Sequence, residues 1–338
     1  MTIERDYSLQ KLNTFGIDAK ASFFSEFHSP EDLQKLLLTR EVATKPILIL
    51  GGGSNILFTK DFSGVVLKNS IQGIQLLKED SGYAYVKSGA GVVWHNLVLY
   101  AIEQKLGGIE NLSLIPGTVG AAPIQNIGAY GVELKDVFES LEAIETATGQ
   151  LKIFHRTECE FGYRDSIFKR DLRGKYIITS VTLKLSKNPR FHISYGAIQD
   201  VLKEMGITEL SVKAVSEAVC SIRKSKLPDP AIIGNAGSFF KNPEILQEQY
   251  DRLKSIYPDL PSFQTSPGMV KVPAGWLNEQ CGWKGKTIGN TGVHKHQALV
   301  LVNYGNAKGE EIKKLSQEIQ QSVKEKFGIE LETEVNII

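Results

Sequence analysis

The chain has 338 residues, of which 42% are hydrophobic and 23% are charged, and its 39 basic and 38 acidic residues give a formal net charge of +1. This length and composition are typical of a globular protein of two or three domains, and the balanced charge excludes the basic surface of a nucleic-acid-binding protein. No apolar run approaches the roughly 18 residues that cross a bilayer, and the N-terminus has no apolar signal region. The three cysteines form no paired motif, so we expect a reducing, cytoplasmic setting without a metal or disulfide framework.

The N-terminal part predicts a strand, a helix and a second strand that lead to a glycine turn. Residues 21–27 alternate as a strand, Pro30 opens a helix, and residues 46–50 form a short buried strand. Next comes Gly51-Gly-Gly-Ser-Asn55, whose backbone N–H groups can form a nest for an anion. No Lys-Ser/Thr follows, and Ile56 stands where a dinucleotide fingerprint has its third glycine, so the turn matches neither a P-loop nor that fingerprint.

The elements that follow are mostly strands. Residues 56–58 and 65–67 are predicted to form a hairpin around a turn at 61–64. Further elements are expected as strands over 83–87, 138–146, 151–154, 176–185, 298–302 and 329–337, and as helices over 94–102, 197–205, 212–226, 245–256, 274–281 and 312–327. Residues 282–296 are expected to form a glycine-rich loop, and His294 and His296 within it have no third ligand for a metal.

The stretch from Ile115 to Gly131 is almost uncharged and contains four glycines and two prolines. Such a segment forms neither helix nor strand, yet it lacks the polar side chains of a solvated loop. Its backbone N–H and C=O groups need partners, and a flat polar cofactor is one candidate. The alternative is a structural Gly/Pro loop packed under other elements, and composition favours neither.

Several single residues also allow two interpretations. The Tyr163-Arg164 pair is typical of a surface turn, and Lys226 can simply complement the dipole at the end of a helix. Ser238 lies among glycines and two phenylalanines, which fits either a buried site or a tight turn. Glu334 belongs to an alternating strand whose polar face would ordinarily be solvated.

Taken together, these segments resemble the UDP-N-acetylenolpyruvoylglucosamine reductase family, flavoenzymes of peptidoglycan precursor synthesis. The resemblance covers nearly the whole chain, and the 191–196 region resembles the tyrosine-bearing loop of the family's larger subclass. Seven segments in order carry it: 13–16, 51–55, 115–131, 163–164, 234–243, 271–277 and 332–335.

The resemblance implies a fold of α/β and α+β parts. These are a vanillyl-alcohol-oxidase (PCMH)-type FAD-binding domain in two subdomains, 1–67 and 68–205, and an α+β substrate-binding domain, 206–329. Residues 330–338 are expected to pack back on the first subdomain, and the protein is expected to be a monomer.

The resemblance also implies the ligands and the residues that bind them. FAD is the cofactor, NADPH the hydride donor, and the enolpyruvyl ether of UDP-N-acetylglucosamine the substrate, which is reduced to UDP-N-acetylmuramate. The implied FAD contacts are Gly52, Gly53, Ser54, Asn55, Pro116, Gly117, Val119, Gly120, Ala121, Gly128 and Ala129. The implied substrate contacts are Tyr163, Tyr195, Lys226 and Asn242.

Three residues would carry the chemistry. Hydride arriving at C3 of an electron-rich enol ether pushes charge into the carboxylate, which needs a cation and a hydrogen-bond donor. By resemblance, Arg164 is the cation, Glu334 the protonated donor, and Ser238 the acid that protonates C2.

Two alternatives remain. Another FAD-dependent oxidase of alcohols or sugars would share the glycine turn but would not need Arg164, Ser238 and Glu334 together. A non-catalytic nucleotide-sugar binding protein would lack the flavin.

Overall fold

A computed structural model describes residues 2–338, which form two compact units. The first comprises residues 2–7, 21–53 and 62–225, and the second comprises residues 8–20, 54–61 and 226–338. The backbone therefore passes from one unit to the other within the glycine turn, between Gly53 and Ser54.

The first unit begins with a four-stranded sheet in the order β1-β2-β5-β3. Strand β5 pairs in parallel with both β2 and β3. Ser29 caps the helix α1 by accepting a hydrogen bond from Asp32 N, and Leu33 and Leu36 bury its apolar face against Val65 and Leu67 of β5. The elements are β1 (Glu4–Ser8), β2 (Lys20–Phe27), α1 (Pro30–Leu37), α2 (Arg40–Thr44), β3 (Ile47–Leu50) and β5 (Phe62–Asn69).

The predicted hairpin over residues 56–67 is wrong. Strand β4 (Ile56–Leu57) belongs to the second unit and pairs in parallel with β20 (Asn336–Ile337), whereas β5 lies between the parallel strands β2 and β3. The residues at 61–64, predicted to form the turn of a hairpin, instead connect the second unit to the first. Residues 336–337 thus pair with the segment that follows the glycine turn.

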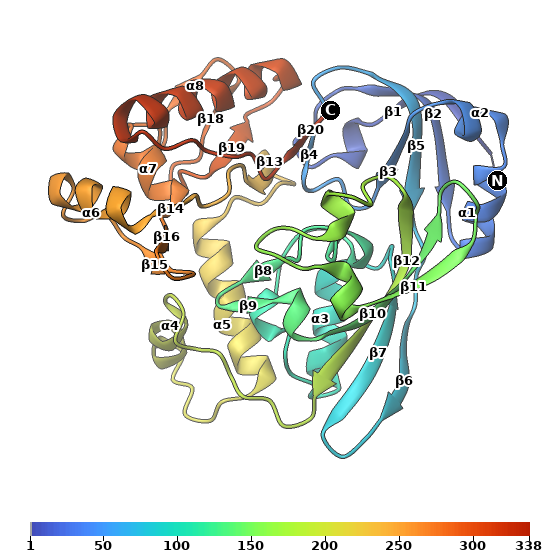
Figure 1. Ribbon diagram of the computed structural model, residues 1–338, viewed down its shortest axis with the longest axis horizontal. Helices are drawn as coiled ribbons and strands as arrows, with labels where there is room; N and C mark the ends of the chain where they lie inside the picture. Colours follow the sequence, from blue (N-terminus) through green and yellow to red (C-terminus); the bar gives the residue numbers. More distant parts are fainter. Residues whose placement is uncertain (1) are drawn as a thin grey trace. The chain divides into compact units, whose positions relative to one another are not determined.

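A five-stranded sheet of order β11-β10-β12-β7-β6 forms the larger part of the first unit (Figure 1). Its neighbours are antiparallel, and the predicted strand pair 138–154 is confirmed as the β10–β11 hairpin. The edge strand β6 was not predicted, because polar and apolar residues do not alternate along its sequence, and most of its residues are exposed. The strands and the covering helix are β6 (Ile74–Glu79), β7 (Tyr83–Gly89), α3 (Trp94–Glu103), β10 (Phe138–Glu145), β11 (Leu151–His155) and β12 (Tyr176–Ser186).

Short elements and two helices complete the first unit. The Ser211 hydroxyl accepts a hydrogen bond from Ala214 N and so caps the start of α5. A separate small core joins α4 to α5 through Ile198, Leu202, Ala218 and Val219. The elements are η2 (Glu110–Leu112), η3 (Val119–Ala121), β8 (Gly128–Ala129), β9 (Val132–Glu133), η4 (Leu134–Asp136), η5 (Arg156–Cys159), η6 (Ile167–Lys169), α4 (Ile198–Glu204) and α5 (Val212–Lys226).

The second unit contains a four-stranded sheet, β13-β19-β18-β17, with helix α8 packed against β18 and β19, and a three-stranded sheet, β14-β16-β15. The N-terminal segment joins this unit through Asn303, whose Nδ2 donates to Phe15 O at 2.8 Å. Its elements are η1 (Gln10–Leu12), β13 (Gly234–Ser238), β14 (Glu244–Leu246), α6 (Gln247–Ile256), β15 (Phe263–Gln264), β16 (Met269–Lys271), α7 (Ala274–Gln280), β17 (Thr287–Ile288), β18 (Thr291–Val293), β19 (Val300–Asn303) and α8 (Gly309–Phe327).

Two predictions in this unit need correction. The segment expected to be a loop, 282–296, contains the β17–β18 hairpin. The hairpin was not predicted because the glycines of this segment indicate a loop. The strand expected at 329–337 is regular only at β20, although Ile329, Leu331 and Val335 are buried as the alternation indicated. Before β20 the segment forms an isolated bridge, Phe240 with Thr333, flanked by the hydrogen bonds from Lys241 N to Glu332 O and from Glu334 N to Phe239 O. The alternation therefore reports burial and not a continuous ladder.

His294 is buried, and its Nδ1 has no hydrogen-bond partner among residues 2–338. Burial, reinforced by His296 and Lys295, lowers the pKa of His294 below its ordinary value of 6.5. Since the folded pKa lies below the unfolded one, the stability contributed by neutral His294 is fully present above the unfolded pKa and is lost as the pH falls toward the folded pKa.

We expect His294→Gln to weaken the fall of the unfolding free energy below pH 6.5 relative to the parent protein. Urea titrations at several pH values measure this, with the exposed His28→Gln as control. A parent and a His294→Gln variant with identical pH dependence would contradict the expectation.

No helix among residues 2–338 is both long and apolar enough to span a membrane.

Candidate active site

The two glycine segments predicted to bind a cofactor lie against each other in the first unit. A Cβ atom at Gly51 would overlap the Thr118 hydroxyl, and one at Gly52 would come within 3.2 Å of Gly117 Cα. Only glycine lets these two backbones approach so closely. Residues 51–52 and 117–118 therefore form one continuous backbone surface.

The backbone N–H groups of this surface fall into two classes. Val119 N donates to Val92 O and Gly120 N to Ala90 O, both at 2.9 Å, and Ala121 N donates to Thr118 O. These three N–H groups are used within the protein, so their residues offer close packing rather than donors. By contrast, the N–H groups of Gly52 and Gly117 donate to no acceptor among residues 2–338.

The central stretch packs as its structural interpretation predicts, and its glycines lie at close backbone contacts. Val119, Ala122 and Ile127 are buried in the main core of the first unit, as expected of a structural loop. The glycines between them lie at close backbone contacts: a Cβ at Gly120 would be 2.5 Å from the Ala90 Cβ. The stretch is thus anchored by its apolar side chains while its glycines shape the surface.

Arg164 reaches the same stretch from the opposite end. Its Nη2 donates to Gly128 O at 2.7 Å, and its Cζ lies 5.3 Å from the centre of the Tyr163 ring. The backbone of Arg164 has a φ of 52°, a left-handed conformation that is costly for a residue with a side chain. The structure therefore brings together Arg164, Tyr163 and Gly128, three of the predicted site residues.

The neighbouring Asn126 was missed by sequence reasoning. It is fully buried, has a φ of 42°, and its Nδ2 donates to Gly162 O at 2.9 Å and to Glu133 Oε2 at 3.1 Å. It thereby joins the central stretch to the turn that carries Tyr163 and Arg164. The available signal was an asparagine within a Gly/Pro-rich loop, where a left-handed conformation is tolerated.

Tyr195 lies next to the end of the central stretch. A Cβ at Gly131 would be 3.5 Å from the Tyr195 Cβ, and the Tyr195 side chain is 43% exposed. The first unit therefore holds Tyr163, Arg164 and Tyr195 around residues 128–131.

The second unit gathers three other predicted residues. Ser238 ends β13 opposite Val300, and the next residue, Phe239, accepts through its O a hydrogen bond from Glu334 N at 2.8 Å. Asn55 Nδ2 donates to Glu334 O at 3.2 Å. Asn55, Ser238 and Glu334 therefore lie in neighbouring backbone segments, and Glu334 is half-buried rather than solvated.

The remaining predicted substrate contacts are also in this unit. Asn242 Oδ1 accepts from Ala274 N at 3.0 Å at the start of α7, which leaves its amide N–H groups to donate elsewhere. Lys226 is exposed at the end of α5, just before the Pro228 carbonyl that accepts from Asn235 Nδ2 at 3.3 Å.

Comparison with known proteins identifies the family. The family model for the C-terminal domain of UDP-N-acetylenolpyruvoylglucosamine reductase matches residues 229–338, and that of an FAD binding domain matches residues 21–154. The UDP-N-acetylenolpyruvoylglucosamine reductases of Amoebophilus asiaticus and Pseudomonas putida are 55% and 47% identical to the chain, and each match covers 100% of both proteins. The chain belongs to the UDP-N-acetylenolpyruvoylglucosamine reductase family.

Solved structures agree with this assignment. The UDP-N-acetylenolpyruvylglucosamine reductase from Thermus caldophilus has a TM-score of 0.69 at 25% identity and covers 100% of this chain and 99% of its own. The 6-hydroxy-D-nicotine oxidase of Arthrobacter nicotinovorans, at 14% identity and a TM-score of 0.55, shares the fold over 97% of this chain and 86% of its own. The predicted family, enzyme class, FAD cofactor and fold class are confirmed.

The geometry of the glycine segments fits an FAD. Gly52 and Gly117 provide backbone N–H groups that have no acceptor among residues 2–338 and lie where two backbones approach closely, which suits the diphosphate of a dinucleotide. Gly128 and Ala129 lie in the short strand β8 beside Arg164.

Replacing Gly120 by alanine should reduce the retention of FAD by the protein. The new Cβ would press on Ala90 and displace the η3 turn, which follows Gly117 and Thr118, at a cost of about 1–3 kcal/mol. The flavin-to-protein absorbance ratio after gel filtration measures the loss. Gly82→Ala is the matched control, because a Cβ there meets only Asp80 Oδ1 at 3.7 Å. Equal FAD content in the two variants would show that the contact with Ala90 does not shape the cofactor surface.

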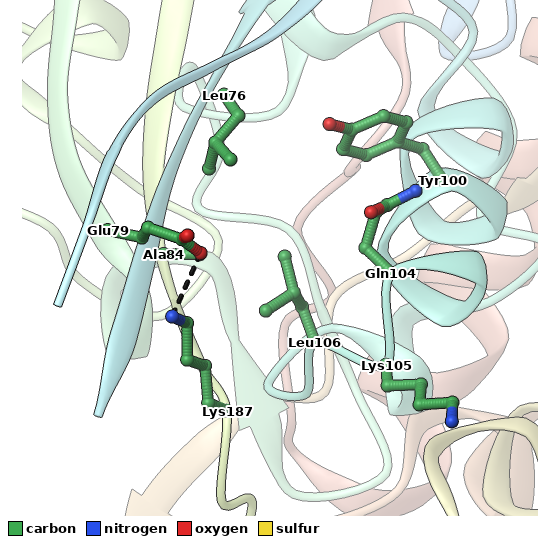
Figure 2. Close-up of a pocket in the computed structure, with 8 residues that line it drawn as sticks. All are labelled: Leu76, Glu79, Ala84, Tyr100, Gln104, Lys105, Leu106 and Lys187. Atoms are coloured by element: carbon green, nitrogen blue, oxygen red, sulfur yellow. Dashed lines mark ion pairs between the residues drawn. The ribbon is translucent and has the colours of Figure 1, made fainter. Parts of the chain in front are cut away.

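A separate pocket of about 240 Å³ lies between α3 and the β6–β7 edge of the first unit (Figure 2). The Glu79–Lys187 ion pair, 2.8 Å long, forms one wall, and Tyr100 and Gln104 lie on the facing wall. None of its eight lining residues is a predicted site residue of the reductase, so the pocket enters no step proposed below.

Proposed function

We propose that the chain reduces UDP-N-acetyl-3-O-(1-carboxyvinyl)glucosamine to UDP-N-acetylmuramate, with NADPH as the hydride donor. The observation that carries the proposal is the full-length match to UDP-N-acetylenolpyruvoylglucosamine reductases. It is supported by the hydrogen bond from Arg164 to Gly128 O, in the loop proposed to bind FAD. When bound, FAD supplies the chemistry that passes a hydride from NADPH to the sugar substrate.

Arg164 is proposed to hold the substrate carboxylate. Hydride arriving at C3 of the enol ether drives negative charge into that carboxylate, and a fixed guanidinium stabilises it as it develops. The hydrogen bond to Gly128 O and the Tyr163 ring orient the guanidinium before the substrate arrives. This preorganisation supports the role of Arg164 and explains why a costly backbone conformation is retained.

Glu334 and Ser238 are proposed to complete the proton and charge transfers. Glu334, in its protonated form, donates a hydrogen bond to the same developing oxyanion, and the Ser238 hydroxyl gives its proton to C2. The support is their shared backbone contact, Glu334 N to Phe239 O, which fixes the two segments side by side in the second unit. A free hydroxyl is a weak acid, so this transfer requires assistance from neighbouring groups.

The UDP end of the substrate is proposed to bind through Tyr163, Tyr195, Lys226 and Asn242. Lys226 is an exposed point charge suited to a phosphate, and Asn242 keeps its amide donors for a ligand. We place FAD binding in residues 1–205, divided at residue 67, and substrate binding in 206–329. We further propose a cytoplasmic monomer of the subclass with the tyrosine loop.

The two half-reactions test this function. The FAD-loaded protein should be bleached by NADPH under anaerobic conditions and then reoxidised by the enolpyruvyl UDP-sugar far faster than by oxygen. Faster reoxidation by oxygen would favour an alcohol or sugar oxidase. A protein without a flavin spectrum would favour a binding protein.

A further inference from the structure

Strand β13 contains a β-bulge just before Ser238. Asn235 pairs with Val302 of β19 and Ser238 pairs with Val300, so three steps along β13 match two steps along β19. Gly237, within the bulge, has a left-handed φ of 71°. A bulge of this kind changes the direction of the side chain that follows it.

The bulge determines which face of the sheet Ser238 occupies. Val302 and Val300 are two residues apart and therefore lie on the same face of β19. Their partners Asn235 and Ser238 share that face, although residues three apart in a regular strand point to opposite faces. The Ser238 hydroxyl makes no hydrogen bond within residues 2–338, so its place is set by the backbone of the bulge.

Asn235 stabilises this bulge with its side chain. It is 4% exposed, and its Oδ1 accepts from Gly237 N at 2.9 Å, which closes a turn across the bulge. Its Nδ2 donates to Ile233 O at 2.8 Å and to Pro228 O at 3.3 Å. Asn235 N donates to Thr14 O at 3.0 Å, and Thr14 Oγ1 donates to Asn235 O at 2.6 Å. These bonds fix the asparagine and aim its acceptor at the glycine of the bulge.

We propose that Asn235 is a positioning residue for the proton donor Ser238. By accepting from Gly237 N it keeps the glycine left-handed and the bulge in place, which holds Ser238 on the face from which its hydroxyl reaches the substrate. The inference rests on the proposed function, in which Ser238 protonates C2.

Asn303 of β19 offers a matched control in the same sheet. It is 7% exposed, its Oδ1 accepts from Gly305 N at 2.8 Å, and its Nδ2 donates to a backbone carbonyl of the N-terminal segment. Asn303 pairs with Gly234, at the opposite end of β13 from Ser238. Both asparagines close a turn at a glycine, but only the turn of Asn235 leads into Ser238.

The test compares Asn235→Ala with Asn303→Ala in the FAD-loaded protein. Anaerobic rapid mixing measures flavin reduction by NADPH and reoxidation by saturating enolpyruvyl UDP-sugar. We expect Asn235→Ala to slow reoxidation about 10–10²-fold, the effect of displacing a catalytic group by about 1 Å. Its reduction by NADPH, and both half-reactions of Asn303→Ala, should stay within about twofold of the parent.

Combination with Ser238→Ala separates positioning from a general structural role. If Asn235 acts through the Ser238 hydroxyl, Asn235→Ala should slow the reoxidation of a Ser238→Ala protein by less than about twofold further. A general disturbance of the site would slow reoxidation equally in both backgrounds.

Gly237→Ala tests the bulge without changing Asn235. A Cβ at Gly237 or at Gly305 meets nothing within 4 Å, so alanine adds only backbone strain at either position. Gly237→Ala should slow reoxidation about tenfold or more, whereas Gly305→Ala should stay within about twofold of the parent. This pair decides the question if Asn235→Ala does not fold.

Parent-like reoxidation of Asn235→Ala or Gly237→Ala, equal slowing in Asn303→Ala or Gly305→Ala, or equal slowing by Asn235→Ala with and without the Ser238 hydroxyl would overturn the inference. A parent protein that the enolpyruvyl UDP-sugar does not reoxidise would instead overturn the proposed function. Parent-like reoxidation of Ser238→Ala would overturn the role of Ser238 within it.

Discussion

Ser238→Ala should leave the NADPH-dependent half-reaction nearly intact while slowing reoxidation by the enolpyruvyl UDP-sugar by about 10²–10⁴-fold, the usual loss of a general acid. The physical reason is the order of events. The Ser238 proton is needed only after hydride has reached the substrate, and hydride transfer from NADPH involves no such proton.

Rapid-mixing measurements of flavin absorbance separate the two half-reactions under anaerobic conditions. Ser238 ends β13 next to Phe239, which is fully buried, so loss of one hydroxyl should not disturb the fold. Ser255→Ala, an exposed position in the same unit, is the control and should behave as the parent. Equal slowing of both half-reactions by Ser238→Ala would refute the assignment of Ser238 as the acid.

Arg164→Lys should slow the same reoxidation by about 10²–10³-fold, although the charge is kept. An ammonium group lacks the planar fork of N–H donors with which a guanidinium can bond both the Gly128 carbonyl and a carboxylate. The flexible lysine chain would also no longer be held along the Tyr163 ring.

The control for Arg164 is nearby in sequence. Arg170 pairs with Glu160 and Asp165 at the protein surface, so Arg170→Lys should change the rate less than twofold, roughly the effect of a surface ion pair. If Arg164→Lys and Arg170→Lys reoxidise at similar rates, the guanidinium geometry is not what stabilises the transition state.

Sequence analysis predicted elements well where burial is periodic or where a proline marks a helix start. Pro30 is the first residue of α1, as expected, and the β10–β11 hairpin combines alternating residues with a clear turn. It failed where a local pattern has a distant partner. Ile56 and Leu57 look like one arm of a hairpin, yet they pair with residues almost at the other end of the chain.

The candidate site shows the same division. The glycines at 51–52 and 117 were identifiable because a tight backbone approach has a compositional signature. Asn126 was not, because it acts through hydrogen bonds made only in the folded protein. In the sequence, a single asparagine has no pattern that separates a buried support from a surface residue.

The pairing of β4 with β20 also sets an order of events during protein synthesis. Thr59 N and Oγ1 both donate to Ile338 O, a contact between positions 279 apart. On the ribosome, residues 54–61 emerge early but cannot pair until the final strand follows, so an open strand edge persists through most of translation. Contacts of such large sequence separation form slowly, and exposed edges favour aggregation. We therefore expect the second unit to complete its folding only after residues 336–338 have been made, and to depend on chaperones more than the first.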